Sequence, residues 1–373
     1  MKRENKAMNI RDYSREDWLR STFPEWGTWL NEEIEAEIVQ PKTVAMWWLG
    51  CVGIWVKTPG GTQIAIDAWT GSGKRTHGSG AMTPGHLFAN MCGSRMQQPN
   101  LRAAPVVFDP FAVNRIDAVL ATHSHSDHMS PELASRVVRE SMTAPNAGGK
   151  LSPVPFIGPR KSVEKWLEWG VPRENCRIVK PGDELQVGDV HIVVLDSFDR
   201  SCLVTTDSTG ADREILTDTC PSDMDDRAVN YLLCTPGGNI YHSGDSHYSV
   251  NFARHGKEYE IDIAFAALGL NPIGIQDKME SVEVLRMAEA LRCKVVIPLH
   301  YDVWTNTKPN VEEIPVLYQM RRDALGYAFH PYIWEVGGKY TYPTDAERTR
   351  HHFERGFSDC FSHEQNIPFR SML

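Results

Sequence analysis

The 373-residue sequence predicts an α/β protein in which helices cover β-sheets. Short segments rich in Val and Ile alternate along the chain with longer segments of helical pattern, which is typical of layered α/β proteins. Hydrophobic residues make up 41% of the chain and charged residues 23%, an ordinary balance for a globular protein. Because no linker is visible, we expect a single domain over residues 1–373, with a helical extension at 1–40.

The expected elements begin with a short acidic helix at 28–39. A hairpin follows, in which residues 43–57 and 62–67 flank a Pro-Gly-Gly turn and the second strand ends at Asp67. From about 69 to 113 the pattern dissolves among many Gly and Pro residues, so we expect a long inserted loop, a kind of segment that is often functional. Further strands are expected near 117–122, 154–157, 190–195, 229–234, 239–242, 261–266 and 294–299, and further helices near 130–142, 161–169, 279–291 and 311–324.

The charge balance excludes some classes of protein. A net charge of −9 argues against nonspecific binding of nucleic acid, which needs a basic surface. The polar first 15 residues lack the apolar core of a signal peptide, and no stretch approaches the ~18 apolar residues of a membrane span. We therefore expect a cytoplasmic protein with no membrane or nucleic-acid partner. The eight cysteines form no Cys-x-x-Cys pair, so we expect reduced, buried thiols.

One short segment carries the chemistry. Residues 121–128 read Ala-Thr-His-Ser-His-Ser-Asp-His. In an extended segment His123 and His125 lie on the same face, and Asp127 and His128 follow at the turn into the next helix. Imidazole and carboxylate groups at this spacing suit Zn, Mn or Fe. The alternative, a polar loop before a helix, explains Ser130 and Pro131 but leaves the histidines unexplained.

A His-x-His-x-Asp-His segment after a strand resembles the signature of the metallo-β-lactamase superfamily, whose members fold as αββα sandwiches. The resemblance implies that Asp67 supports the site, that Asp245 of Ser243-Gly244-Asp245 bridges two metals, and that His300 is the last His ligand. From the residues alone, Asp67 and Asp245 can equally be turn residues, and His300 an ordinary partly buried histidine.

One ligand of that superfamily is missing here. A His is expected at a strand end between the first motif and Asp245, whereas His191 lies near the start of a strand. Asp199 stands where the missing His is expected, and a carboxylate there favours Mn²⁺, with Zn²⁺ as the alternative. The competing interpretation pairs Asp199 with Arg200 or Arg227.

Four longer segments, at 21–27, 46–51, 225–231 and 241–248, resemble the L-ascorbate-6-phosphate lactonases of that superfamily, and this resemblance covers essentially the whole chain. It implies hydrolysis of a small phosphorylated lactone to 3-keto-L-gulonate 6-phosphate in ascorbate catabolism, by a metal-bound hydroxide that attacks the lactone carbonyl. Asp127 and Asp67 are then the catalytic carboxylates. The resemblance also implies a homo-oligomer.

Four residues are candidate substrate contacts: Lys74, Arg75 and His77 in the expected loop, and His247. The alternative for the loop residues is a solvated charge cluster. Gly71-Ser72-Gly73-Lys74 is not a nucleotide-binding loop, because Ala68 and Arg75 stand where Gly and Ser or Thr are required. Two other functions stay open: a phosphodiesterase related to the tRNA-processing ribonucleases, against which the acidic charge counts, and a noncatalytic metal-binding protein.

Overall fold

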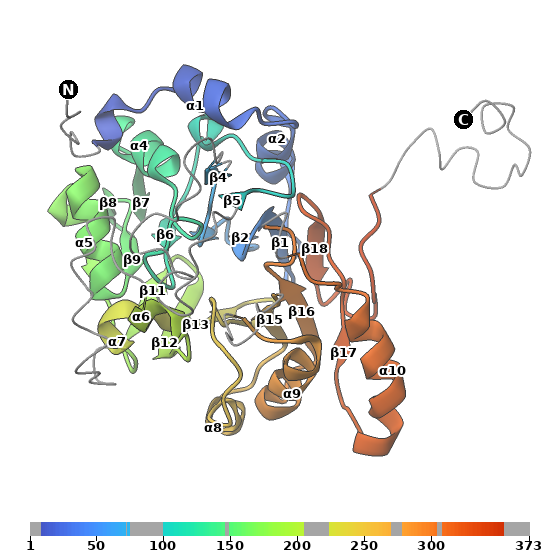
Figure 1. Ribbon diagram of the computed structural model, residues 1–373. Helices are drawn as coiled ribbons and strands as arrows, with labels where there is room; N and C mark the ends of the chain where they lie inside the picture. The colour runs from blue at the N-terminus through green and yellow to red at the C-terminus, as the bar shows by residue number, and fades with distance from the viewer. Residues whose placement is uncertain are drawn as a thin grey trace, which may run out of the picture.

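Two large sheets form the centre of the computed structural model, which describes residues 9–71, 73–74, 100–145, 149–204, 224–269, 278–303 and 308–353 (Figure 1). The first sheet has the strand order β10-β9-β6-β3-β2-β1-β18, and the second has β11-β12-β13-β14-β15-β16-β17. The strands of the first sheet are β1 (Val44–Gly50), β2 (Gly53–Lys57), β3 (Gln63–Ile66), β6 (Ala118–Leu120), β9 (Phe156–Gly158), β10 (Cys176–Ile178) and β18 (Lys339–Tyr342). Those of the second are β11 (Glu184–Val187), β12 (Val190–Asp196), β13 (Val229–Thr235), β14 (Gly238–His242), β15 (Ile263–Ala267), β16 (Val295–Leu299) and β17 (His330–Pro331).

Helices cover the outer faces of both sheets (Figure 1). Those packed with the first sheet are α2 (Trp29–Ala36), α4 (Pro131–Arg139) and α5 (Arg160–Trp169), and those packed with the second are α8 (Phe252–Glu258), α9 (Ser281–Leu291) and α10 (Glu313–Leu325). The shorter elements are η1 (Ile10–Asp12), α1 (Arg15–Thr22), η2 (Pro110–Ala112), η3 (Arg173–Asn175), α6 (Ser201–Val204), α7 (Met224–Arg227) and the paired strands β4 (Gly73–Lys74) with β5 (Asn100–Leu101) and β7 (Thr143–Pro145) with β8 (Leu151–Pro153).

The alternation of side chains along β1 shows how the layers are held. Met46 and Trp48 belong to a core between the two sheets, whereas Ala45 and Trp47 belong to a second core beneath the helices of the first sheet. Successive residues of a strand point to opposite faces, so a fully apolar strand contributes side chains to both cores. A third core lies between the second sheet and its helices. The predicted α/β class and its αββα layering are confirmed.

The helices predicted at 28–39, 130–142, 161–169, 279–291 and 311–324 match α2, α4, α5, α9 and α10 to within a few residues. The segment 43–57, predicted as one arm of a hairpin, is instead two antiparallel strands, β1 and β2, joined by a turn at Cys51 and Val52. Helix α4 begins as expected, since Ser130 Oγ accepts a hydrogen bond from the Leu133 N–H and Pro131 occupies the first turn. The N-terminal helices are tied to the sandwich: Lys57 Nζ donates to Ile34 O at 2.7 Å and Trp18 Nε1 to Thr70 O at 2.8 Å. The expected loop at 69–113 is described only at its two ends, because residues 75–99 lie outside the described residues.

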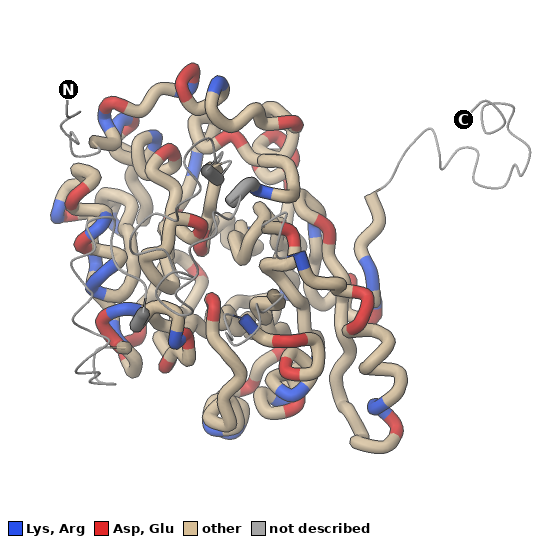
Figure 2. The backbone as a smooth tube through the Cα atoms, in the orientation of Figure 1, with Lys and Arg blue, Asp and Glu red and all other residues tan. Residues whose placement is uncertain are grey.

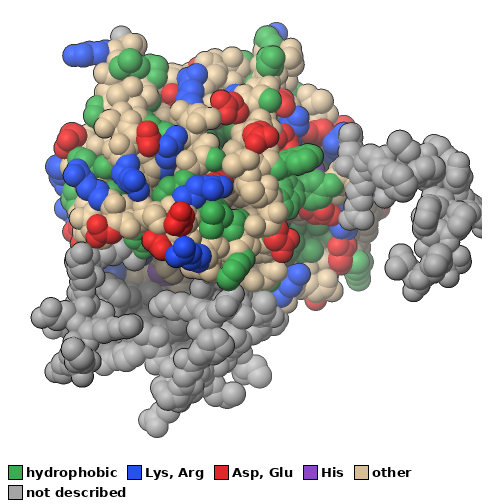
Figure 3. Space-filling view, turned by 90° about the horizontal axis from the view of Figure 1, so that it is seen from above, with side chains coloured by type: hydrophobic (Ala, Val, Ile, Leu, Met, Phe, Trp, Pro, Cys, Tyr) green, Lys and Arg blue, Asp and Glu red, His purple; other side chains and the backbone are tan. Residues whose placement is uncertain are grey.

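Acidic and basic residues alternate along the described backbone, as Figure 2 shows, and their side chains are intermixed on the face seen in Figure 3. This distribution agrees with the mild negative net charge of −9. Among the described helices, none has both the length and the apolar character that crossing a membrane requires.

The strand directions determine where a site can form. In the first sheet β6 runs parallel to β3 and β9, and in the second β14, β15 and β16 run parallel to one another. The carboxyl ends of parallel strands meet at one edge of a sheet, which is where ligands bind in many α/β proteins. Asp67, His123, Asp245 and His300 all follow the carboxyl ends of such strands.

Candidate metal centre

Two clusters of ligand-type side chains lie at the carboxyl ends of these strands. The first cluster consists of His123 and His125, which follow β6, Asp199, which follows β12, and Cys202 in α6. One ligand atom from each lies within 4.8 Å of those of the others. His123 Nε2 is 3.9 Å from Asp199 Oδ2. Asp199 therefore lies beside the His pair, where the sequence predicted a replacement for the missing His.

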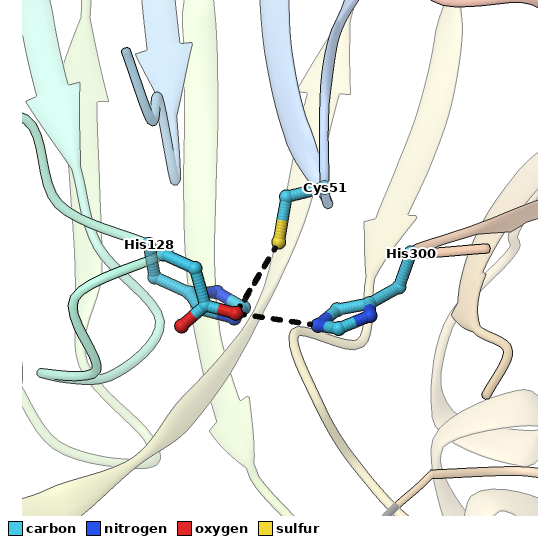
Figure 4. A group of neighbouring side chains, drawn as sticks. Cys51, His128 and His300 are labelled. Atoms are coloured by element: carbon cyan, nitrogen blue, oxygen red, sulfur yellow. Dashed lines mark hydrogen bonds and ion pairs between the residues drawn. The ribbon is translucent and has the colours of Figure 1, made fainter. Parts of the chain in front are cut away.

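The second cluster consists of Asp127, His128, His300 and Cys51. Asp127 Oδ2 is 3.5 Å from His300 Nε2 and 3.9 Å from His128 Nε2. Figure 4 shows Cys51, His128 and His300 pointing toward one another from three separate parts of the chain. The three come from the β1–β2 turn, the segment after β6 and the end of β16.

Asp245 lies between the two clusters. Its Oδ2 atom is 3.9 Å from His123 Nε2 in the first cluster, and 3.2 Å from His128 Nε2 and 3.7 Å from His300 Nε2 in the second. The Lys278 ammonium lies 2.7 Å from the same oxygen. A carboxylate in this position can serve both clusters at once.

Asp67 contacts the His128 ring on the side away from the second cluster and orients it. Its carboxylate accepts hydrogen bonds from Thr122 N at 2.7 Å and Thr122 Oγ1 at 2.6 Å, and its Oδ2 lies 3.1 Å from His128 Nδ1. A carboxylate at Nδ1 fixes the imidazole with Nε2 directed at the cluster, as happens behind metal-binding histidines. Asp67 therefore lies where it can orient His128, and its supporting role stays a prediction.

Gly244 allows the Asp245 turn to approach the histidine segment. It adopts a φ of 49°, and a Cβ built on it would lie 2.7 Å from Thr122 Oγ1. Since that distance is shorter than carbon–oxygen contact allows, only glycine fits without displacing Thr122. The Ser-Gly-Asp pattern is therefore a packing requirement here as well as a sequence resemblance.

The centre fits a divalent metal. Within the described part of the chain, Nε2 of His123, His125 and His300 and Oδ1 of Asp245 are buried polar atoms without a hydrogen-bond partner. Such atoms cost free energy unless something pairs with them. The three histidines belong to the two clusters and Asp245 lies between these clusters, and each of the four atoms offers a lone pair to a cation. The residues present can therefore hold a metal ion.

The charges of the centre also favour a bound metal ion. Burial, reinforced by the neighbouring His128 and His125, holds the pKa of His123 well below its ordinary value, so its imidazole is neutral and able to coordinate. Burial also acts on His128, but the neighbouring carboxylates of Asp245, Asp127 and Asp67 raise its pKa well above the ordinary value. The centre thus carries an excess of negative charge, which a divalent cation would neutralise.

The other predicted site residues lie elsewhere or outside the description. His247 is buried, and its Nδ1 lies 3.3 Å from the Arg200 N–H, which donates to it. Lys74 lies on β4, whose backbone alone is described, while Arg75 and His77 lie outside the described residues. His191 lies near the start of β12, beside Glu184 at 3.3 Å, far along the strand from Asp199.

Sequence reasoning missed three residues of the centre: Cys51, Cys202 and Lys278. The search for cysteine ligands relied on Cys-x-x-Cys spacing, which cannot detect thiols contributed singly by distant turns. Cys51 directly follows β1 at Gly50, but the sequence predicted one segment over 43–57, so no predicted strand end marked it. Cys202 lies three residues after Asp199, and its Sγ donates to Asp199 Oδ2 at 2.7 Å. No local pattern marks Lys278.

Comparison with known proteins supports the same assignment. Residues 46–300 match the family model described as "Beta-lactamase superfamily domain". The chain is 51% identical over 364 residues to "Probable L-ascorbate-6-phosphate lactonase UlaG" of Escherichia coli strain SMS-3-5, covering 98% of this chain and 99% of the relative. The protein of the same name from Escherichia fergusonii is also 51% identical, with the same coverage.

The chain belongs to the metallo-β-lactamase superfamily. Within it, the two relatives described above, each 51% identical to this chain, are named as probable L-ascorbate-6-phosphate lactonases. Two solved structures share the fold at low identity: an isothiocyanate hydrolase from Delia radicum gut bacteria (TM-score 0.55, 15% identical, covering 79% of this chain and 98% of that one) and "a possible metal-dependent hydrolase" from Veillonella parvula (TM-score 0.54, 11% identical, covering 81% and 99%).

Proposed function

We propose that the protein is a metal-dependent lactonase that hydrolyses L-ascorbate 6-phosphate to 3-keto-L-gulonate 6-phosphate. The observation that carries the proposal is the buried pair of clusters joined by Asp245, with unpartnered ligand atoms directed into it. The 51% identity over nearly the full length to proteins named for this activity supports the choice of substrate.

The proposed ligands are His123, His125 and Asp199 for one ion, Asp127, His128 and His300 for the other, and Asp245 between them. A divalent ion bound there supplies Lewis-acid polarisation of the lactone carbonyl and lowers the pKa of water. Imidazole nitrogens and carboxylate oxygens suit Mn²⁺, Fe²⁺ and Zn²⁺. Because Asp199 provides an oxygen where the superfamily has an imidazole nitrogen, we favour Mn²⁺ for the first cluster, with Zn²⁺ as the alternative.

The protein's own groups then position the reactants. Asp67 keeps the His128 ring in one orientation through the 3.1 Å contact with its Nδ1 atom. His128 and His300 lower the pKa of Asp127 although burial opposes them, so Asp127 is ionised and can accept a hydrogen bond from the attacking water. The Lys278 ammonium, 2.7 Å from Asp245, places a positive charge beside the centre, where it can stabilise negative charge that develops on the carbonyl oxygen.

The phosphate of the substrate is proposed to be a binding handle that is not cleaved. Lys74, Arg75, His77 and His247 remain our candidates for contacting it. Binding energy from a part of the substrate that does not react can lower the barrier at the part that does. A substrate without the phosphate should then lose turnover as well as affinity.

The decisive experiment combines metal analysis with three substrates. The purified protein should contain a divalent metal and open L-ascorbate 6-phosphate, with kcat/KM at least roughly 100-fold above that for free ascorbate, the equivalent of about 2.7 kcal/mol of transition-state binding. A chromogenic phosphodiester should not be cleaved. Preferred cleavage of the phosphodiester would replace the proposal with phosphodiesterase activity, and bound metal without any turnover would leave a noncatalytic metal-binding protein. Equal kcat/KM for the two ascorbates would remove the phosphate handle and the roles of the four candidate residues.

A further inference from the structure

The thiol of Cys51 lies inside the second cluster. Cys51 is fully buried on the turn between β1 and β2. Its Sγ atom is 3.8 Å from Asp127 Oδ2 and 3.9 Å from His128 Nε2, and it lies within 4.8 Å of the His300 ligand atom. Figure 4 shows the sulfur directed toward the space between His128 and His300.

The backbone holds this thiol in place from both sides. The Cys51 N–H lies 3.1 and 3.0 Å from the two carboxylate oxygens of Asp302, and its carbonyl accepts the His300 N–H at 2.9 Å. Cys51 also adopts a left-handed φ of 56°, a conformation that costs a non-glycine residue about 1 kcal/mol or more. The turn is therefore fixed to the end of β16, which is followed by His300. The Cys51 thiol and the His300 imidazole are thus held beside each other in the cluster.

The distances suit four ligands around one ion. Metal–nitrogen and metal–oxygen bonds of about 2.0–2.2 Å and a metal–sulfur bond of about 2.3 Å place tetrahedral ligands roughly 3.3–3.6 Å apart. The Asp127–His300 distance of 3.5 Å falls in this range, and both sulfur distances exceed it by only a few tenths of an ångström. Independently, the buried His300 Nε2 has no hydrogen-bond partner in the described residues, so the cluster has an atom that needs a ligand partner.

Cys202, the thiol of the first cluster, has a different arrangement. Its Sγ donates to Asp199 Oδ2 at 2.7 Å, a close contact that gives its proton an acceptor. The corresponding Cys51–Asp127 distance is 3.8 Å, too long for a strong hydrogen bond. Cys202 therefore supports a carboxylate, whereas Cys51 directs its sulfur into a group of ligand atoms.

We propose that Cys51 is a thiolate ligand of the metal held by the second cluster, alongside Asp127, His128 and His300. This inference rests on the proposed metal centre and adds a soft donor to it. Binding replaces the thiol proton by the metal, so the proton leaves to solvent as the metal–sulfur bond forms. A thiolate favours Zn²⁺ or Co²⁺ over Mn²⁺. The two clusters thus differ in kind, and the second selects the softer ion.

Cobalt provides a direct test, because a Co²⁺–thiolate bond gives an intense near-ultraviolet charge-transfer band that nitrogen and oxygen ligands do not. The full-length protein loaded with Co²⁺ should show this band. Cys51→Ser should lose it and bind the corresponding Co²⁺ roughly tenfold or more weakly. Cys202→Ser and Cys293→Ser, a buried thiol outside both clusters, are the matched controls and should keep it.

Each other result overturns the inference. A wild-type Co²⁺ protein without the band has no thiolate ligand, a band that persists in Cys51→Ser comes from another thiol, and loss of the band only in Cys202→Ser moves the sulfur to the first cluster. If Cys51→Ser fails to fold, zinc X-ray absorption of the Cys202→Ser protein tests the inference instead. Its spectrum must show a sulfur neighbour about 2.3 Å from the zinc, and the absence of sulfur overturns the inference. Failure of the wild-type protein to bind any divalent metal would instead reject the proposed metal centre itself.

Discussion

The two clusters of the centre are supported in different ways. In the second cluster, His128 is held by Asp67 and Cys51 by Asp302, so side chains from distant strand ends fix these two ligands. In the first cluster, Asp199 is held within its own turn, by the Ser201 N–H at 2.9 Å, the Ser201 hydroxyl and the Cys202 thiol. A ligand bonded directly by a side chain from another strand end is preorganised. The hydrogen bonds that the described residues give to the Asp199 carboxylate come from its own turn, and that turn is tied to the Asp245 segment through the Arg200 N–H, which donates to His247 Nδ1. We therefore expect the second cluster to bind its ion more tightly and to tolerate substitution less.

The largest effect is expected at His128. His128→Ala removes a ligand of the second cluster and exposes the Asp67 carboxylate to an empty space, so turnover should fall to background and the metal content should drop. Strands β3 and β6 do not depend on this side chain, so the far-ultraviolet circular dichroism should be kept. His125→Ala should also abolish turnover through the first cluster. Near-wild-type turnover in a metal-free His125→Ala protein would contradict the role of the motif.

A smaller but still large effect is expected from Asp67→Asn. The amide cannot accept hydrogen bonds at both of its positions, so the His128 ring loses its fixed orientation. Metal affinity should fall roughly 10- to 100-fold, measured by competition with a chelating dye. Asp117 offers a matched control, because its carboxylate accepts the Gln63 N–H at 2.7 Å in the same sheet but outside the centre. If Asp117→Asn weakened metal binding as much as Asp67→Asn, the effect would be a general loss of structure.

Asp199→His is expected to change metal preference more than overall activity. Imidazole is the better zinc ligand, so the ratio of activity with Zn²⁺ to activity with Mn²⁺ should rise by about tenfold. The apo proteins would be titrated with each metal and assayed with L-ascorbate 6-phosphate. An unchanged metal preference would mean that Asp199 does not reach the ion, in line with the alternative that it pairs with an arginine.

The smallest effect is expected at His191. This residue lies near the start of β12, and Asp199 follows the other end of that strand. Its ring is 41% exposed and lies 3.3 Å from Glu184 on the surface. Surface pairs of this kind contribute about 0–1 kcal/mol. His191→Gln should leave kcat/KM and metal content unchanged and shift thermal stability by only a few degrees. A marked loss of metal would show that the first cluster extends further along β12 than the ligand distances indicate.

The sequence predicted the parts of the centre that follow from local pattern. The histidine segment was located by its own spacing after an apolar run. Asp67, Asp245 and His300 were assigned through the resemblance to the superfamily, and their places at strand ends supported that assignment. Asp199 was predicted only because the His that the superfamily has at this strand end is absent from the chain. Cys51 and Lys278 were missed because what brings them to the centre is tertiary: a bond from Cys51 to Asp302, and an ion pair from Lys278 to Asp245. No periodicity encodes a contact between residues so far apart.

The hydrogen bond between Cys51 and Asp302 also has a consequence for how the protein is made. It joins residues 251 positions apart, so the second cluster cannot close until almost the whole chain has left the ribosome. During synthesis the histidine segment is present long before His300, and contacts of such large sequence separation form late and slowly. An ion can then occupy the completed second cluster only late in folding, where it stabilises the native state by mass action.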